Sequence, residues 1–288
     1  MKIGDVKKVC VAGTGQMGRQ IALGIALSGY DTYLMSRSQE SLDKVNAWAT
    51  DYLADRVAKE KLTKEKADAA KAKFHLTTSI EEAANVQLVI ESVVEEKDAK
   101  VKFFKDFNAH ASKDTILASN SSYMPSSLFV EHVDNPGRVV NLHYFNPALV
   151  MKLVEVVKGP HTSDEAVTLC MEFSKATGKT PILLNKEIDG FVVNRVLRAI
   201  RDEAYYLIEQ GICSPQDLDI GVKLGLNHPM GVFELLDITG VDLNYLSGKR
   251  RWEETGVKPN GFDIVKEMYE QKKWGKKTGE GFYKYEKK

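Results

Sequence analysis

A glycine-rich turn near the start of the chain constrains its fold more than any other feature. Residues 9–12 form a short apolar, β-prone segment, and Gly13-Thr14-Gly15-Gln16-Met17-Gly18 follows directly. Apolar residues then recur at near-helical spacing, and residues 31–35 form a second β-prone segment. Between a strand and a helix, the pattern G-x-G-x-x-G binds the pyrophosphate of a dinucleotide, whereas alone it is often only a packing turn. The flanking elements favour the dinucleotide site.

The residues of this turn have separate expected tasks. The first glycine makes the tight turn, the second lets a phosphate approach the backbone, and the third lets the helix pack closely on the strand. The N-terminus of the helix supplies free N–H groups and positive potential for the anion. We therefore predict that the turn binds the cofactor through Gly13, Gly15, Gln16, Met17 and Gly18.

The end of the second β-prone segment indicates which dinucleotide is bound. An acidic residue about 20 positions after the glycine motif usually holds the ribose 2′-hydroxyl of NAD. This chain has Ser36-Arg37-Ser38 there and no acid. An arginine and two hydroxyls suit a 2′-phosphate better than a 2′-hydroxyl. The sequence predicts a preference for NADP; the alternative is that Arg37 points to solvent and both NAD and NADP are used.

The composition narrows the range of functions. The 288 residues are enough for two domains, and 40 Lys and Arg balance 40 Asp and Glu. This balance gives no case for nucleic acid or an anionic membrane. No apolar run approaches the roughly 18 residues of a membrane span, and the first residues carry no apolar signal segment. The widely spaced Cys10, Cys170 and Cys213 argue against disulfides and a metal site. We expect a cytoplasmic protein without metal.

Strand and helix signals alternate from residue 8 to about 185 and then give way to helical signals alone. This order predicts an α/β fold, in which a doubly wound, Rossmann-type parallel sheet domain (1–187) is followed by a smaller all-helical domain (188–288). Residues 39–73 are charged and lack Gly and Pro, so we expect a helical arm with a break near 61–63. It is either a solvated insertion or a substrate-contact arm. The segment 191–210 is too apolar for one exposed helix, which favours a homodimer.

Two residues in apolar strands are candidates for proton transfer. His143 ends the apolar segment 138–142, and ligands gather at the C-terminal ends of strands in open α/β sheets. Glu155 interrupts the apolar segment 151–157, and a buried Glu needs a partner. A neighbouring strand would bring Glu155 to the imidazole of His143, where it would orient the ring and stabilise the imidazolium. The alternatives are a core histidine and an edge-strand glutamate that faces water.

Other polar residues follow apolar segments in the same way. The run Ser119-Asn120-Ser121-Ser122 is either a set of ligands for substrate or nicotinamide, or an ordinary helix cap. Asn194 is polar within an apolar helix start and needs partners from the backbone or a substrate. Glu91 and Glu95 either border the nicotinamide or belong to a solvated loop and helix start.

Taken together, these motifs resemble the L-3-hydroxyacyl-CoA dehydrogenase family, and within it the bacterial 3-hydroxybutyryl-CoA dehydrogenases. The resemblance covers nearly the whole chain. It rests on residues 13–18, 118–122, 142–147, 150–156, 190–195, 227–231 and 275–283. Several long motifs in the right order make it specific.

The resemblance implies roles for individual residues. His143 matches the catalytic base, Glu155 the acid that orients it, Ser122 the serine that contacts the substrate 3-oxygen, and Asn194 the active-site asparagine. Glu95 and Lys100 match cofactor-contacting positions. The family is homodimeric through its helical domain and transfers a hydride reversibly between C3 of an acyl-CoA substrate and the nicotinamide.

The chain departs from the family pattern in three places. Ser36 and Arg37 stand where most relatives carry the ribose-binding Asp, Ser121 replaces the usual Thr, and Asp189 replaces the usual Pro before Gly190-Phe191, with one residue inserted nearby. Two other functions stay open. One is a dehydrogenase of a hydroxy acid that is not a CoA thioester, and the other is a dinucleotide-binding protein without turnover.

Overall fold

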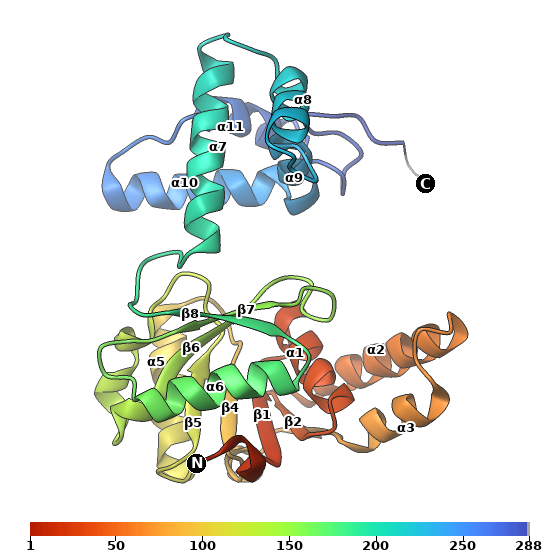
Figure 1. Cartoon of the computed structure of the whole chain (residues 1–288), viewed down its shortest axis with the longest axis vertical. Coiled ribbons are helices and arrows are strands. Elements are labelled where there is room, and N and C mark those ends of the chain that lie inside the picture. The colour runs from red at the N-terminus through yellow and green to blue at the C-terminus, as the bar shows by residue number, and fades with distance from the viewer. Residues whose placement is uncertain (287–288) are drawn as a thin grey trace. The chain divides into compact units, whose positions relative to one another are not determined.

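The structure, a computed structural model, describes residues 1–286, and the chain divides into two compact units (Figure 1). The first unit runs from Met1 to Val192, and the second begins at Val193. The boundary predicted from the sequence lies a few residues earlier, between residues 187 and 188. Within residues 1–286, no helix has both the length and the apolar character that a membrane span requires.

The first unit is built on one sheet of eight strands in the order β3-β2-β1-β4-β5-β6-β7-β8. All neighbouring strands are parallel except β6 and β7, which are antiparallel. Their bounds are β1 (Lys8–Ala12), β2 (Asp31–Met35), β3 (Phe74–Thr77), β4 (Leu88–Glu91), β5 (Ile116–Ser119), β6 (Val139–Tyr144), β7 (Leu153–Val157) and β8 (Thr180–Leu184).

Helices cover both faces of the sheet because successive residues of its central strands point to opposite sides. Val9 and Val11 of β1 pack in the core that includes α1 (Gln16–Leu27) and α6 (Asp164–Ala176). Cys10 and Ala12 pack in the other core, with aromatic residues of α5 (Lys97–His110). The predicted doubly wound sheet followed by a helical domain is confirmed.

The helical arm consists of α2 (Gln39–Ala58) and α3 (Lys64–Ala72), which Figure 1 shows projecting from the side of the sheet. Ser38 and Thr63 cap their N-termini by accepting hydrogen bonds from Ser41 N and Lys66 N. The break between the two helices therefore lies where the sequence predicts it. The shorter helices of this unit are α4 (Ile80–Ala84) and the 3₁₀ turns η1 (Ile3–Asp5), η2 (Ser126–Leu128), η3 (Val130–His132) and η4 (Pro136–Arg138).

The second unit contains five helices within its described residues: α7 (Val193–Glu209), α8 (Pro215–Gly225), α9 (Val232–Thr239), α10 (Val241–Thr255) and α11 (Phe262–Glu270). Tyr205, Phe233 and Val265 belong to its core, and Phe282 and Tyr283 of the C-terminal segment pack against them. Gly211 follows the end of α7, and Ser214 caps α8, with Pro215 as its first residue.

Candidate functional site

The turn after β1 has the geometry that a dinucleotide pyrophosphate requires. Gly13 has a φ of 116°, and a Cβ there would collide with the carbonyl oxygen of Ser92. A Cβ at Gly18 would collide with the carbonyl oxygen of Gly13, so helix α1 packs closely on the strand. A Cβ at Gly15 would meet nothing within 4 Å, and this residue is the N-cap of α1. The residues of the turn therefore fit an anion at the N-terminus of α1.

The end of β2 carries the residues predicted to read the ribose. Ser36 is fixed by a hydrogen bond from its N–H to Thr77 O (3.1 Å), and its hydroxyl accepts from Ser38 N (3.3 Å). The Ser38 hydroxyl caps α2 and retains its own proton for donation. Arg37 is exposed, and within the described residues its guanidinium has no hydrogen bond or ion pair. Its donors are therefore available to a ligand.

His143 and Glu155 lie directly opposite each other on the antiparallel strands β6 and β7. The imidazole Nδ1 is 2.8 Å from the Oε2 of Glu155, and both side chains are buried. Because a carboxylate can only accept, this contact places the proton on Nδ1 and leaves Nε2 with a lone pair that can accept a hydrogen bond or a proton. Glu155 Oε1 accepts a hydrogen bond from Val192 N (3.1 Å). An edge-strand glutamate facing water is therefore the wrong alternative, because β8 covers the other side of β7.

The second ring nitrogen of His143, Nε2, contacts the serine run that follows β5. The Oγ of Ser122 lies 3.1 Å from His143 Nε2. The rings of Phe145 and Phe191 pack against the imidazole at centroid distances of 4.6 and 5.4 Å. The hydroxyl of Ser122 and the Nε2 nitrogen of His143 are thus in direct contact, and two aromatic rings pack against the imidazole. Ser121 has a different position, because its Oγ accepts from Met124 N (2.9 Å) and holds the turn itself.

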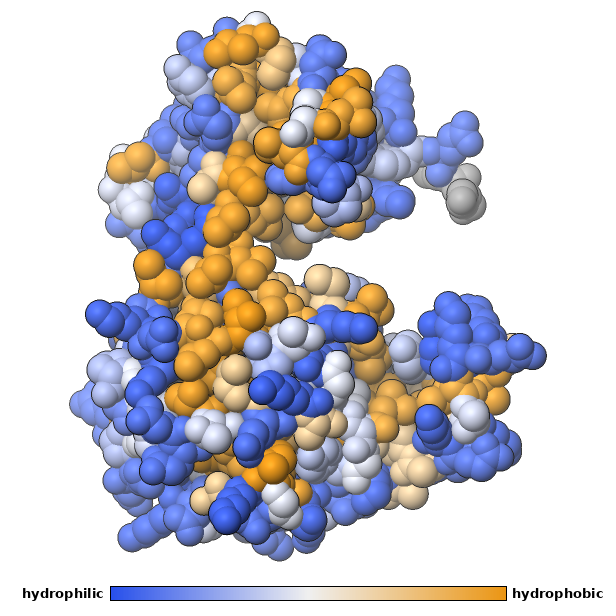
Figure 2. Space-filling view, viewed as in Figure 1, coloured by the Kyte–Doolittle hydropathy of each residue, from blue (hydrophilic) through white to orange (hydrophobic). Residues whose placement is uncertain are grey.

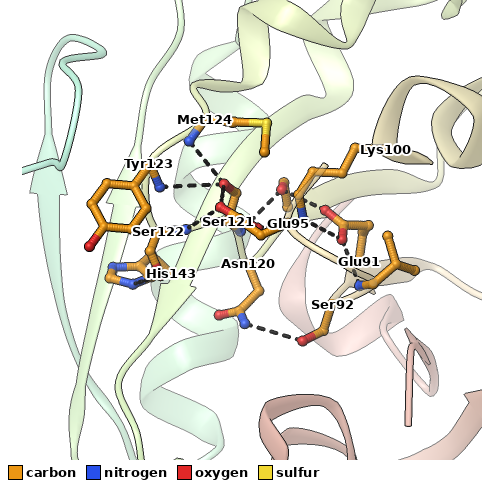
Figure 3. A network of polar contacts seen from close by, with 12 residues as sticks. Glu91, Ser92, Glu95, Lys100, Asn120, Ser121, Ser122, Tyr123, Met124 and His143 are labelled. Atoms are coloured by element: carbon orange, nitrogen blue, oxygen red, sulfur yellow. Dashed lines mark hydrogen bonds and ion pairs between the residues drawn. The ribbon is translucent and has the colours of Figure 1, made fainter. Parts of the chain in front are cut away.

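A second group of charges lies behind the serine run (Figure 3). Lys100, on α5, pairs with Glu91 at the end of β4 (2.7 Å) and with Glu95 (3.0 Å). Glu91 and Lys100 are buried, so the solvated-loop alternative is wrong for Glu91. Burial raises the pKa of the Glu91 carboxyl above its usual value, while the Lys100 ammonium and the hydrogen bonds from Ser119 and Val93 act in the opposite direction.

Asn120 joins the ends of three central strands. Its side-chain oxygen accepts from Tyr144 N (2.8 Å) at the end of β6, and its amide group donates to the hydroxyl of Ser92 (3.3 Å), just after β4. The sequence places Asn120 among the possible ligands, whereas the structure assigns its polar atoms to this bracing contact. Asn194, by contrast, lies in the first turn of α7 in the second unit, and its role stays a prediction.

Two features of the site were not found by sequence reasoning. The buried ion pair between Glu91 and Lys100 joins residues nine positions apart on a strand and a helix. Glu91, like Glu155, is a carboxylate within an apolar strand segment, but the sequence gives no direct sign of its partner. The aromatic neighbours of His143 had no signal beyond their apolar character. Within residues 1–286, no group of three or more His, Cys, Asp or Glu residues could hold a metal ion.

The comparison with known families covers both units. Residues 8–188 match the model of the 3-hydroxyacyl-CoA dehydrogenase NAD-binding domain, and residues 190–285 match that of the 3-hydroxyacyl-CoA dehydrogenase C-terminal domain. The first match supports a nicotinamide dinucleotide as cofactor.

Individual relatives give the same result over the full length. A probable 3-hydroxybutyryl-CoA dehydrogenase of Deinococcus radiodurans is 34% identical, over 96% of this chain and 100% of the relative. The crystal structure of an (S)-3-hydroxybutyryl-CoA dehydrogenase from Ralstonia eutropha superposes with a TM-score of 0.89 at 33% identity, covering 98% of this chain and 100% of that one. A diketoreductase acting on dicarbonyl compounds also superposes with a TM-score of 0.89, at 28% identity and coverages of 97% and 99%. These likenesses confirm the resemblance predicted from the sequence.

Proposed function

The chain belongs to the 3-hydroxyacyl-CoA dehydrogenase family, and we propose that it interconverts a short-chain 3-hydroxyacyl-CoA and the corresponding 3-oxoacyl-CoA, such as 3-hydroxybutyryl-CoA and acetoacetyl-CoA. The observation that carries this proposal is the row of three side chains Ser122, His143 and Glu155, joined by contacts of 3.1 and 2.8 Å. A hydroxyl, a base nitrogen and an orienting carboxylate are the groups that a secondary alcohol needs in order to lose its proton.

In the oxidation, the Nε2 atom of His143 accepts the proton of the 3-hydroxyl as the C3–H bond breaks and the carbonyl forms. The glycine turn at residues 13–18 would hold a nicotinamide dinucleotide, which would supply the hydride chemistry at C3 in both directions. The Glu155 carboxylate stabilises the imidazolium, and the hydroxyl of Ser122 donates to the substrate 3-oxygen. In the reduction, the imidazolium returns its proton to that oxygen. Asn194 is expected to add a further contact to the substrate.

Initial rates with acetoacetyl-CoA test this function, with NADH and NADPH run in parallel. We expect turnover that depends on the thioester and on a reduced dinucleotide. A protein that binds the dinucleotide but turns over neither acetoacetyl-CoA nor 3-hydroxybutyryl-CoA would show that the proposal is wrong. It would then favour a dinucleotide-binding protein without catalysis.

A substrate without CoA is the second candidate, favoured by the likeness to the diketoreductase, which acts on dicarbonyl compounds. The two candidates share the dinucleotide turn and the His143 pair, so they differ only in what is attached to the reacting carbonyl. Rates with acetoacetate and with a simple diketone, measured beside acetoacetyl-CoA, distinguish them. A higher kcat/KM for either free carbonyl compound would move the assignment to this candidate.

We propose further that the chain prefers NADP. The turn residues 13–18 would hold the pyrophosphate, and Ser36, Arg37 and Ser38 would surround the ribose. Ser36 has no carboxylate and therefore does not repel a 2′-phosphate. The unpaired guanidinium of Arg37 offers that phosphate several hydrogen-bond donors in one plane. One charge-assisted hydrogen bond is worth about 1.5–3 kcal/mol, which corresponds to a preference of roughly tenfold or more.

The cofactor preference is tested by a double substitution. Ser36→Asp with Arg37→Ile restores a carboxylate and removes the cation, so we expect the ratio of kcat/KM for NADPH over NADH to reverse. Lys44→Met, which removes an exposed cation further along α2, is the control and should leave the ratio unchanged. Equal or better use of NADH by the unaltered chain would overturn the preference.

We also propose that the second unit forms a homodimer. Its described surface exposes large apolar side chains on and beside α8 and α10, and Leu224 is 84% exposed. Figure 2 shows apolar surface gathered over this unit, near the connection between α7 and α8. Contiguous apolar surface of this kind marks an interaction site in a globular protein. Sedimentation at micromolar concentration should give a dimer, and a monomer would contradict the proposal.

A further inference from the structure

The most deeply buried cation near the site is Lys100. Its side chain is only 1% exposed, and its ammonium lies 2.7 Å from Glu91 Oε1 and 3.0 Å from Glu95 Oε2. Glu91 is itself immobilised, because it accepts hydrogen bonds from Val93 N (2.7 Å) and from the hydroxyl of Ser119 (2.7 Å). Lys100 is therefore anchored on its inner side by a carboxylate that two further hydrogen bonds hold in place.

Glu95 forms the outer side of this group. It is 34% exposed, and its two oxygens face different partners. Oε2 faces Lys100, whereas Oε1 accepts from Ser122 N (3.2 Å) and from the hydroxyl of Ser121. The carboxylate of Glu95 thus links the anchored ammonium to the backbone of the serine turn.

The series of contacts ends at the imidazole, since Ser122 Oγ lies 3.1 Å from His143 Nε2 (Figure 3). We infer that Lys100 is a positioning residue which, with Glu91 behind it, holds Glu95 against the serine turn and so fixes the Ser122 hydroxyl beside His143. The expected effect on turnover rests on the proposed function, whereas the expected effect on the geometry of the Ser122 hydroxyl and the His143 imidazole is independent of that function.

Stability alone does not explain this buried pair. Removing two charges from water costs about as much free energy as their attraction returns, and apolar residues of similar volume are often as stable in such places. The ammonium of Lys100 is enclosed by two carboxylates and is almost without exposed surface. The burial of the pair is explained if it serves to fix Glu95.

The variant that tests the inference must remove both buried charges together, because Lys100→Met alone would leave Glu91 as an unpaired buried carboxylate. In Glu91→Gln with Lys100→Met, the Gln oxygen can still accept from Val93 N, and its amide can donate to the Ser119 hydroxyl. We expect a folded protein, whose rates are measured at saturating NADPH because the family resemblance places Lys100 at a cofactor-contacting position. Its kcat should fall by roughly 10- to 100-fold, the usual cost of a small misplacement of reacting groups.

Lys102→Met on the same helix is the matched control. Lys102 pairs with Asp106 on the surface (2.6 Å), two residues away from the buried lysine, and its loss should leave kcat unchanged. A rise in the dissociation constant for NADPH at unchanged kcat would make Lys100 a cofactor contact instead. A lower Tm with normal kcat per folded molecule would make the pair purely structural. Either result would overturn the inference.

A double-mutant cycle shows whether the effect passes through Ser122. If it does, the pair of substitutions should change kcat by less than about threefold in a Ser122→Ala background, because the hydroxyl that it positions is already absent. An undiminished 10- to 100-fold loss in that background would refute the inference.

A spectroscopic readout separates this inference from the proposed function. In the ligand-free protein, the ¹⁵N resonance of His143 Nε2, assigned by its loss in His143→Ala, should move in Glu91→Gln with Lys100→Met and stay in place in Lys102→Met. This measurement needs no turnover. If acetoacetyl-CoA is not a substrate but the resonance moves, only the proposed function fails. If turnover is normal in the parent and the resonance is unmoved, only the inference fails.

Discussion

Among the described residues, each compact unit buries two carboxylates, and the two units provide them with opposite kinds of partner. In the first unit, Glu91 pairs with the ammonium of Lys100 and Glu155 with the imidazole of His143. Both partners are side chains that can carry a positive charge, and an imidazole can both accept and donate a proton. The buried charges of this unit therefore border a place where a proton can move.

In the second unit, the buried carboxylates are those of Asp219 and Asp237, and their partners are neutral. Asp219 accepts from the backbone N–H groups of two residues at the start of α9 (2.9 and 3.0 Å) and from the hydroxyl of Tyr283 (2.8 Å). Asp237 accepts from Phe282 N and Tyr283 N (both 2.9 Å) and from the hydroxyl of Tyr285 (3.0 Å). These donors fasten the C-terminal segment to the helices.

The difference shows that burial of a carboxylate does not by itself mark a catalytic group. Backbone amides hold a charge in place but cannot accept a proton, so a carboxylate surrounded by them orders structure. A carboxylate beside an imidazole can support proton transfer because its partner changes charge. Variants at the buried charged groups of the first unit should therefore lower turnover. Variants at the buried carboxylates of the second unit should lower stability and leave turnover unchanged.

The largest expected effect is that of His143→Ala in the first unit. Because general acid–base catalysis contributes about 10²- to 10⁴-fold, turnover should fall by that range. The imidazole is not part of the turn that is proposed to bind the dinucleotide, so NADPH binding should stay nearly unchanged. Steady-state rates and a fluorescence titration with NADPH check both parts. Near-normal turnover in a folded variant would contradict the assignment of the base.

Glu155→Gln should have the next largest effect. Gln preserves the shape of the side chain but removes the charge that stabilises the imidazolium, and its amide can present a donor to Nδ1. We expect turnover to fall by up to about 100-fold through the loss of orientation. The same rate measurements check this expectation, with Glu131→Gln, an exposed position on η3, as a control. Unchanged turnover would show that the two residues do not act as a pair.

The sequence was sufficient for the first strand–turn–helix unit and for the position of His143, because glycine spacing and strand ends are local signals. It did not predict β3, whose four residues Phe74–Thr77 alternate between apolar and polar side chains and carry no apolar run. It also did not predict that β6 and β7 are antiparallel. Only the length and path of the turn at residues 145–152 decide this, and the direct pairing of His143 with Glu155 depends on it.

The contacts of the site that remained hidden are those between distant segments. Nothing near Glu91 in the chain indicates that Lys100 turns inward, because a lysine on a helix is usually solvated. The distinction between Ser121, which holds the turn, and Ser122, which faces the imidazole, depends on backbone geometry that neighbouring serines in a sequence do not reveal. Pairing of charges across elements is a property of the fold.

In the second unit, Asp219→Asn should reduce stability and leave catalysis unchanged. The amide group of Asn would face at least one donor that now binds a carboxylate oxygen, which costs about 1–3 kcal/mol. Urea denaturation measures the loss, and kcat per folded molecule should equal that of the parent. Asp263→Asn, which removes an exposed partner of Lys258, should change stability by less than about 0.5 kcal/mol. A fall in kcat without a loss of stability would remove the contrast between the two units.

The smallest expected effect is a pH dependence at Asp237. Burial, with a contribution from the charge of Asp219, raises the pKa of this carboxyl above its ordinary value of about 3.9 despite the three hydrogen bonds that it accepts. The folded state therefore holds the proton more tightly than the unfolded chain, and this group stabilises the fold as the pH falls from the raised pKa toward the ordinary one.

Glu234 has the opposite sign, because Lys223 and the N–H of Gly231 lower its pKa. Its contribution is present above the ordinary pKa and disappears as the pH falls through the lowered one. We expect that, as the pH is lowered from about 7 to about 4, the unfolding free energy of the parent rises relative to that of Asp237→Asn. Over the same range it should fall relative to that of Glu234→Gln. Taking each difference at the same pH cancels the titrations that parent and variant share. The same sign for both variants would show that burial does not govern the protonation of Asp237.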